Sequence, residues 1–176
     1  TEGSDVSFSA TRLTCYALIA AIEDDLRAGL ETAIGDEPIE RAISAEQIEK
    51  GQGRRKADGL GAATSVAGLL PYLDFSDGYE LSMTHKDLLS PEMVGSLKAI
   101  APNLQRVIAI RNRVAHTRPM EIDDSAHLLD VAEQLKASKA EWVTTTETLA
   151  RIASDPSYVI GLTICLPPDT DPGIQH

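Results

Sequence analysis

Aromatic residues are scarce in this chain, at 4% of its 176 residues, while alanine and leucine are plentiful. A β-sandwich core draws on aromatic and β-branched side chains, whereas alanine and leucine favour helices. The hydrophobic content of 43% is too high for a generally disordered chain. The composition therefore predicts an all-α fold in one domain with its own core.

Long apolar runs and cysteines are also few. No run approaches the ~20 residues that a membrane helix needs, and the acidic start is not a secretory signal. The two cysteines, Cys15 and Cys165, lie among apolar neighbours without a CxxC pair or a Cys/His cluster. This pattern favours buried thiols over a disulfide or a metal site. We therefore expect a cytoplasmic protein with no membrane partner, metal or cofactor.

Apolar residues recur at helical spacing along most of the chain, and prolines, glycines and capping residues mark the ends. The spacing predicts helices over residues 9–35, 38–48, 60–70, 90–101, 102–117 and 123–155. Residues 51–56, with two glycines and three bases, predict a surface loop, and residues 71–80 predict a turn region. Residues 1–155 are thus expected to form the helical domain. Residues 156–176, β-like at first and then proline-rich, are expected to form an extended tail or linker.

Acidic residues are missing from one window of an otherwise acidic chain. The formal net charge of −11 argues against a general nucleic-acid binder. Residues 93–120, however, contain no Asp or Glu. The bases in this window are Lys98, Arg106, Arg111, Arg113 and Arg118. Such a distribution suits a protein that holds phosphate at one place. The alternative is that these arginines pair with acids on neighbouring helices.

Two other charged groups have structural and functional interpretations. Glu23, Asp24 and Asp25 lie in the middle of the first predicted helix, where a solvated face is the simplest interpretation. The basic run at residues 54–56 is an ordinary solvated loop or a contact for RNA backbone.

The candidate chemistry lies in residues 111–116, Arg-Asn-Arg-Val-Ala-His. The patterns GxxxxGK[ST], GxGxxG, HExxH and GxSxG are all absent from the sequence. Asn112 and His116 are four residues apart on the predicted helix and share a face, and the long side chain of Arg111 reaches the same patch.

These three residue types suit RNA cleavage without a metal. An imidazole can take the proton of the attacking 2′-hydroxyl near neutral pH. A guanidinium stabilises the charge that builds up on phosphorus, and an amide can orient the imidazole or a phosphate oxygen. The structural alternative is a helix end at which His116, Arg113 and Arg118 favour the helix dipole.

Residues 111–116 resemble the signature of the HEPN superfamily, which is Arg, a polar residue, a short gap and then His. The apolar helix before the motif, and Arg118-Pro119 and Ile122-Asp123-Asp124 after it, are similar to the branch found in RNA-surveillance endonucleases and bacterial defence proteins. The resemblance is specific over about residues 100–136. It implies an all-α, HEPN-like helical bundle that forms a homodimer through the motif helices.

The resemblance also implies roles for individual residues. Arg111, Asn112 and His116 of two copies would form one composite catalytic cleft. Supporting roles fall to three residues of the first helix: Glu23, Asp24 and Arg27. RNA binding falls to the basic window: Arg113, Arg118, Arg106 and Lys98.

The expected function is a metal-independent endoribonuclease of toxin or anti-phage type that leaves 2′,3′-cyclic phosphate ends. The alternatives are a non-catalytic HEPN module for dimerisation or for nucleotide or RNA binding in a larger regulatory protein, and a purely structural helical scaffold. The resemblance implies an attached ATPase or sensor domain, or an antitoxin, as a further partner. The first residue, Thr1, and the linker-like tail favour a domain cut from a longer protein.

Overall fold

The computed structural model describes residues 10–155 and 157–158. The predicted all-α class is confirmed, because the secondary structure in these ranges is helical apart from one isolated bridge between Pro38 and Ser65. Within the same ranges, no helix combines the length and apolar character needed to cross a membrane. Of the predicted tail, only residues 157 and 158 are described; the rest of its β-like run, with Cys165, lies outside the described residues.

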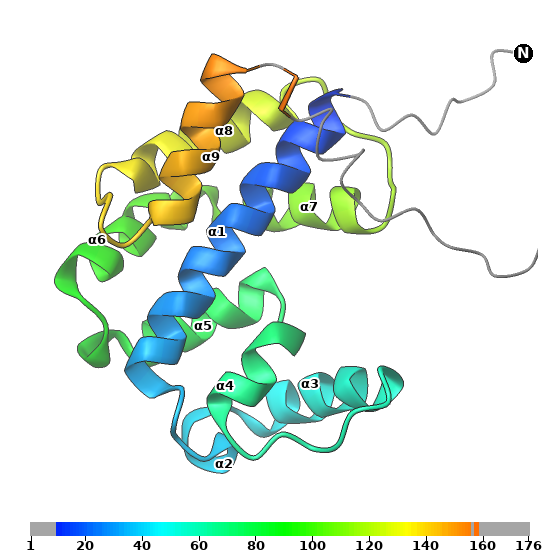
Figure 1. Ribbon diagram of the computed structural model, residues 1–176, viewed down its shortest axis with the longest axis vertical. Coiled ribbons are helices and arrows are strands. Elements are labelled where there is room, and N and C mark those ends of the chain that lie inside the picture. Colours follow the sequence, from blue (N-terminus) through cyan, green and yellow to red (C-terminus); the bar gives the residue numbers. More distant parts are fainter. Residues whose placement is uncertain (1–9, 156, 159–176) are drawn as a thin grey trace, which may run out of the picture.

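The helices are joined by short connections (Figure 1). The bounds are α1 (Ala10–Ile34), α2 (Ile39–Ala42), α3 (Ala45–Ala57), α4 (Val66–Leu69), α5 (Phe75–Thr84), α6 (Pro91–Ile100), α7 (Leu104–Ala115), α8 (Asp124–Lys136) and α9 (Val143–Ser154). Short 3-10 helices lie at Leu70–Tyr72, Lys86–Leu88 and Ala101–Asn103.

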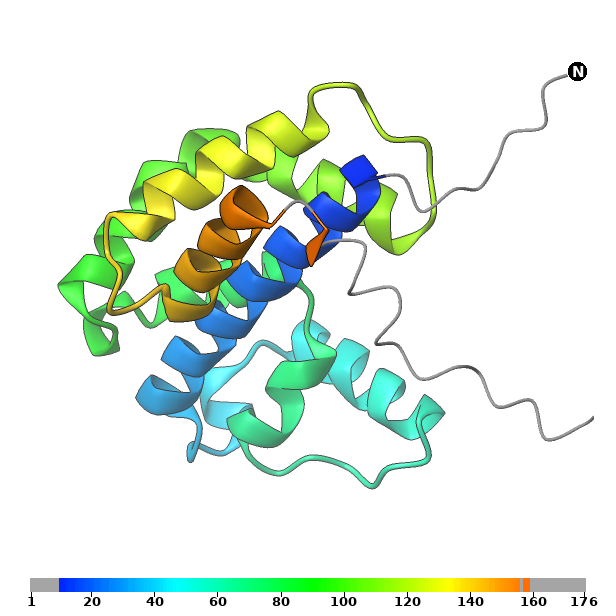
Figure 2. The same cartoon turned by 45° about the horizontal axis from the view of Figure 1, so that its top comes forward.

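Helix α1 is the central element around which the others pack (Figures 1 and 2). Leu18, Ile22, Leu26 and Leu30 recur at helical spacing and are buried. Helices α7, α8 and α9 lie against the N-terminal part of α1, while α2, α4 and α5 lie around its C-terminal part. As a result, α7 with the predicted motif and α3 with the basic run both border one hollow, which Arg111 and Arg54 line.

The acidic group within α1 does not form the solvated face expected from the sequence. Asp25 is 6% exposed and accepts hydrogen bonds from the backbone N–H groups of Thr144 (3.0 Å) and Thr145 (2.7 Å). Its carboxylate therefore caps the N-terminus of α9, where the N-cap residue Trp142 supplies no side-chain bond. Glu23 is also largely buried, whereas the side chain of Asp24 is exposed.

Cys15 is fully buried, as predicted. Burial, followed by the charge of nearby Asp124, raises the pKa of its thiol to about 12. A thiol that resists deprotonation in this way is a packing group rather than a nucleophile or metal ligand.

Two predicted loop regions are helical instead. Residues 51–56 form the second half of α3, where a Cβ at position 51 would meet Leu69 Cδ1 at 2.8 Å. Gly51 thus allows close packing of the helix and does not end it. Residues 75–80 belong to α5, because Asp74 and Asp77 form a reciprocal capping box that starts the helix. Predicting a turn from Ser76-Asp77-Gly78 was wrong for this reason.

Other boundaries were predicted correctly or only in part. Ser90 caps α6 with Pro91 at the first helical position, and Pro102 interrupts the chain between α6 and α7. The single helix predicted over residues 123–155 is wrong, because residues 137–142 separate α8 from α9. Trp142, fully buried at this break, anchors the connection in the core. The helix predicted at residues 60–70 is confined to α4 and the 3-10 turn that follows it.

Asp74 links α3 to α5 through charge. Lys50 Nζ lies 2.7 Å from Asp74 Oδ2 and 2.7 Å from Asp77 Oδ2. Burial alone would raise the pKa of Asp74, but hydrogen bonds from Lys50 and Ser76 and within the capping box outweigh it and hold this pKa well below its usual range. The carboxylate is therefore charged in the folded protein at any pH near neutrality.

We predict that Asp74→Asn lowers the free energy of unfolding at pH 7 by about 1 to 3 kcal/mol, because Lys50 loses one of its two carboxylates. A folded-state pKa below the unfolded value stabilises the protein above the unfolded pKa, and this contribution fades as the pH falls. Urea unfolding from pH 7 downward should show a constant difference above about pH 5 that shrinks below about pH 4. A difference that grows towards acid pH would contradict this interpretation.

Candidate functional site

Helix α7 carries the predicted motif on the outside of the molecule. Val107 and Ile110 are its buried residues, and the helix packs chiefly on α1. Arg111 and Asn112 are half-buried, whereas His116 is exposed at the C-cap position. The motif is therefore presented at the end of a surface helix.

The end of α7 is held by a tight set of backbone hydrogen bonds. Arg118 N donates to Arg113 O (2.9 Å), and Thr117 N donates to Val114 O (3.4 Å). Arg12 from α1 also donates through Nη1 to Arg113 O (3.0 Å). This is a Schellman cap, reinforced by a cation at the negative end of the helix dipole. Arg12 was not singled out from the sequence, since only the fold brings it to this helix end.

Thr117, next to His116, has a φ of 51° in the left-handed region. A β-branched residue rarely adopts this conformation, and glycine is the usual choice at this position of the cap. The hydrogen bonds around Thr117 therefore hold a strained backbone beside the motif histidine.

We predict that Thr117→Gly raises the free energy of unfolding by about 1 kcal/mol, because it removes the left-handed strain. Thr32→Gly, at an exposed position inside α1, should lower it by a similar amount and serves as the control. Thermal unfolding of both variants measures the two effects. Destabilisation by Thr117→Gly would show that contacts of the threonine side chain stabilise the protein by more than the backbone strain destabilises it.

Arg113 makes a buried ion pair with the start of α8. Its Nε donates to Asp124 Oδ2 (2.9 Å), and its Nη2 donates to Asp124 Oδ1. Asp124 is fully buried and also accepts from the backbone N–H of Glu121 (2.9 Å). The hydrogen bonds to Asp124 raise the pKa of Arg113 despite its partial burial. Arg113 thus ties α7 to α8.

Acids at the start of α8 pair with arginines of the acid-free window that precedes it. Arg106 pairs with Asp123 and Arg111 pairs with Glu23, so the alternative of pairing with neighbouring acids holds for Arg106, Arg111 and Arg113. The predicted binding of RNA by Arg106 and Arg113 stays a prediction. Glu121, Asp123 and Asp124 come close enough together to hold a cation, but they face Arg106 and Arg113, and a metal is not needed to explain the cluster.

Arg111 points to α1 rather than along α7 toward His116. Its Nε lies 3.5 Å from Glu23 Oε1, and the other oxygen of Glu23 accepts a hydrogen bond from Arg27 at 3.1 Å. Arg27 also lies 3.7 Å from Asp24. The structure therefore brings together Arg111 and the three residues of α1 that the sequence assigned to supporting roles.

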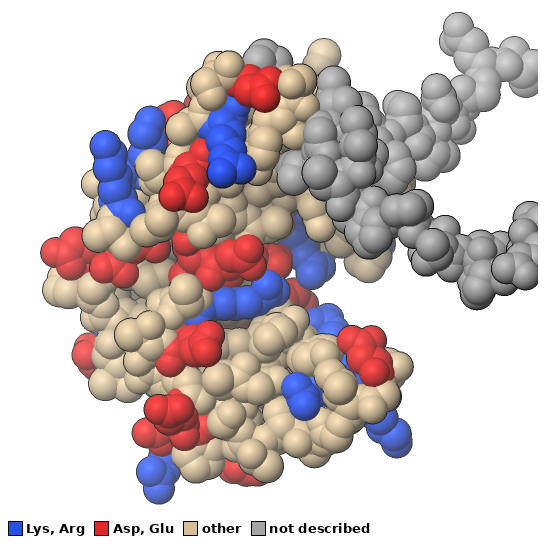
Figure 3. Space-filling model, viewed as in Figure 1, with Lys and Arg blue, Asp and Glu red and all other residues tan. Residues whose placement is uncertain are grey.

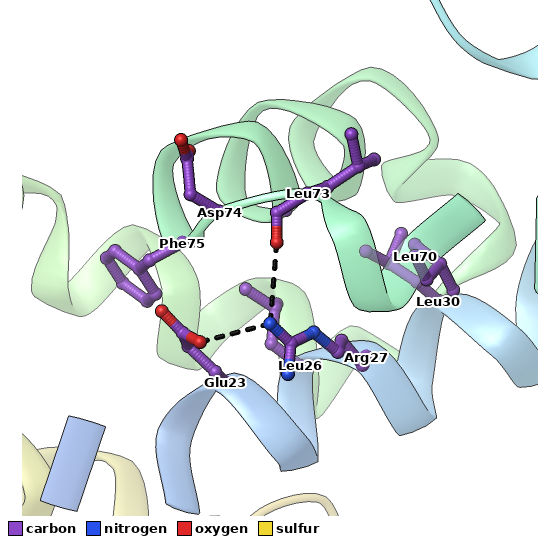
Figure 4. A pocket seen from close by; sticks show the side chains of 9 residues that line it. Glu23, Leu26, Arg27, Leu30, Leu70, Leu73, Asp74 and Phe75 are labelled. Atoms are coloured by element: carbon purple, nitrogen blue, oxygen red, sulfur yellow. Dashed lines mark hydrogen bonds and ion pairs between the residues drawn. The ribbon is translucent and has the colours of Figure 1, made fainter. Parts of the chain in front are cut away.

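Hydrogen bonds hold the side chains of Glu23 and Arg27 in place between α1 and the segment before α5 (Figure 4). The two side chains extend from α1 toward the segment that leads into α5, and Arg27 reaches the carbonyl oxygen of Leu73 at 3.4 Å. Leu26, Leu70 and Phe75 close the space beneath them, leaving a void of about 10 Å³. The guanidinium of Arg27 is therefore held in place by Glu23 and by the carbonyl oxygen of Leu73.

Arg54 joins this group from α3. Its Nη1 donates to Tyr72 O (2.8 Å), and its Nη2 lies 3.5 Å from Asp74. Arg27, Arg54 and Arg111 line one hollow of about 420 Å³, although they are far apart in sequence. Only the basic character of residues 54–56 signalled Arg54 beforehand. The neighbouring Arg55 is used structurally, donating to the carbonyl oxygens of Gly61 and Gly68.

The remaining predicted site residues do not join Arg111 in this hollow within one chain. Asn112 and His116 are not among the residues that line it. Lys98 is exposed on α6 and Arg118 is exposed after α7. Within one chain, Arg111 and His116 therefore do not line a common hollow among those described.

Comparison of the chain with family models, curated proteins and solved structures found no match.

Proposed function

We propose that this protein is a metal-independent endoribonuclease whose active site is completed by a second copy. One observation supports this most strongly. The motif lies toward the end of α7, a helix that packs chiefly on α1, and His116 is exposed there at the C-cap position. A second copy docking there would bring two sets of Arg111, Asn112 and His116 to a two-fold axis.

In this proposal His116 takes the proton from the 2′-hydroxyl as it attacks phosphorus. Arg111 stabilises the charge on the phosphorane, and Asn112 orients the imidazole or a phosphate oxygen. The phosphorus–O5′ bond breaks, the 5′-oxygen takes a proton from water as it leaves, and a 2′,3′-cyclic phosphate remains. The resemblance of residues 111–116 to the HEPN signature suggests the biological role of an effector nuclease kept in check by an antitoxin or by an ATPase or sensor module.

A non-catalytic module that binds RNA or nucleotide is the second candidate. The observation that favours it is the pairing of Arg111 with Glu23, which directs the guanidinium away from His116 within one chain. Such a module would keep a dimer and the hollow lined by Arg27, Arg54 and Arg111, but it would not turn over substrate.

The two candidates differ in a digest of mixed cellular RNA by the purified protein in EDTA, with the product ends identified by mass spectrometry. Endoribonuclease activity predicts cleavage with 2′,3′-cyclic phosphate ends. Intact RNA across a range of substrates, from a protein that nevertheless binds them, would favour the binding module instead.

A further inference from the structure

The hollow that contains Arg27, Arg54 and Arg111 is part of a longer groove, called here the arginine groove. It shares Arg27 and Arg111 with a second hollow of about 390 Å³, whose lining includes Tyr16. Figure 3 shows blue basic atoms in the indentation between the upper and lower parts of the molecule. The groove thus joins a cationic end to an aromatic end.

The arginines of the groove are more accessible than Glu23 and Asp74, two of the three acids that pair with them, whereas the third, Asp24, is itself exposed. The side chains of Arg27 and Arg54 are 31% and 44% exposed, while those of Glu23 and Asp74 are 14% and 15% exposed. Arg111 makes one ion pair at 3.5 Å and donates no hydrogen bond within the described part of the chain. Because each guanidinium has five N–H donors, these side chains keep donors that no hydrogen bond within the described residues uses.

Tyr16 supplies the second element of the groove. It is 55% exposed, which is unusual for a large aromatic side chain in a chain with so few of them. Proteins that bind single-stranded nucleic acid combine a cationic groove for the backbone with aromatic rings on which bases stack. Three guanidinium groups in one hollow match the planar, bidentate recognition of phosphate oxygens.

We propose that the arginine groove binds a single strand of RNA, with backbone phosphates on Arg27, Arg54 and Arg111 and a base stacked on Tyr16. This rests on the proposed function, because Arg111 would belong both to the groove and to the cleavage site, and the groove would lead the strand to that site. The substrate class that follows is single-stranded or looped RNA, whose bases are free to stack.

Three carboxylates, those of Glu23, Asp24 and Asp58, also line the groove, and Asp24 and Asp58 are exposed. They oppose phosphate binding and keep the affinity moderate. Removing one of these charges should therefore tighten binding. A gain of affinity is a useful test because damage to the fold cannot produce it.

The test measures binding of a fluorescent oligonucleotide with 2′-O-methyl riboses, which lacks the attacking hydroxyl and cannot be cleaved by the proposed chemistry. Anisotropy titrations at several salt concentrations give the affinity and its salt dependence. Arg54→Gln should weaken binding about tenfold and lower the salt slope by about one. Arg41→Gln, which removes an exposed charge on α2, is the matched control and should change neither.

Two further variants separate the parts of the groove. Tyr16→Leu should weaken binding about tenfold with an unchanged salt slope, since it removes stacking and no charge. Asp58→Asn should tighten binding about two- to threefold. If Arg54→Gln and Tyr16→Leu both bind as the wild type does, the proposal is overturned.

Competition identifies the ligand. Unlabelled single strands should displace the probe far better than a mononucleotide, inorganic phosphate or an RNA duplex. Equal displacement by the mononucleotide would overturn the strand-binding proposal. A protein that binds strands through Arg54 and Tyr16 but cleaves no RNA would refute the nuclease alone, whereas cleavage that is indifferent to both residues would refute the groove alone.

Discussion

Replacing His116 with alanine is expected to lower the rate of RNA cleavage in EDTA by about 10²- to 10⁴-fold, the usual contribution of a positioned general acid or base. The side chain is exposed at the end of α7 and makes no hydrogen bond among the described residues. Its removal should therefore leave the melting temperature and the proposed dimer unchanged. A loss of activity without a loss of structure would identify His116 as a group that acts on substrate.

The matched control is His127→Gln, a histidine on α8 outside the motif, which should retain wild-type activity. Arg111→Ala should reduce cleavage as His116→Ala does, because both act at the same phosphate. Cleavage at the wild-type rate by both purified motif variants would mean that any nuclease activity comes from another site or from a contaminant.

The largest effect on stability is expected for Asp124→Ala, which should lower the free energy of unfolding by about 3 to 5 kcal/mol. The substitution leaves the largely buried guanidinium of Arg113 without its bidentate partner. It also removes the acceptor for the backbone N–H of Glu121. The connection between α7 and α8 would lose the contact that fixes it.

Urea unfolding of Asp124→Ala measures this effect, and Asp123→Ala is the control. Asp123 is exposed and pairs with Arg106 at the surface, where an ion pair contributes at most about 1 kcal/mol. Replacing both partners, as Arg113→Met with Asp124→Leu, should recover much of the loss because no buried charge remains unpaired. Similar losses for Asp123→Ala and Asp124→Ala would show that burial does not set the strength of the Arg113 pair.

The helices of this fold could be predicted where side chains of the same segment decide the outcome. Ser90 and Pro91 start α6 through their own backbone preferences, and Pro102 interrupts the chain because it lacks an N–H group. Residues 51–56 and 75–80 were misjudged because glycine and Ser-Asp-Gly are ambiguous locally. The packing of Gly51 on Leu69 and the capping box at Asp74 resolve them only in three dimensions.

The sequence alone located the candidate motif, but it did not predict where the side chains of the motif lie. Spacing placed Asn112 and His116 on one helix and suggested that Arg111 reaches the same patch. Instead, Glu23 on α1 attracts Arg111 into the groove. Arg54 and Tyr16 could not be assigned to that groove from the sequence, because their positions near Arg111 depend on how α1, α3 and α7 pack together. Likewise, the buried cap that Asp25 provides for α9 has no local signal.

The central proposal is that two copies of the motif form one site, and mixed dimers test it most directly. Wild-type chains are refolded together with an excess of the Arg111→Ala, His116→Ala double variant, and the rate of RNA cleavage is measured in EDTA as the wild-type fraction falls. If both copies supply essential groups, mixed dimers are inactive and the rate falls with the square of the wild-type fraction. A rate that falls in simple proportion to that fraction would mean that each chain carries a complete site and would contradict the shared site.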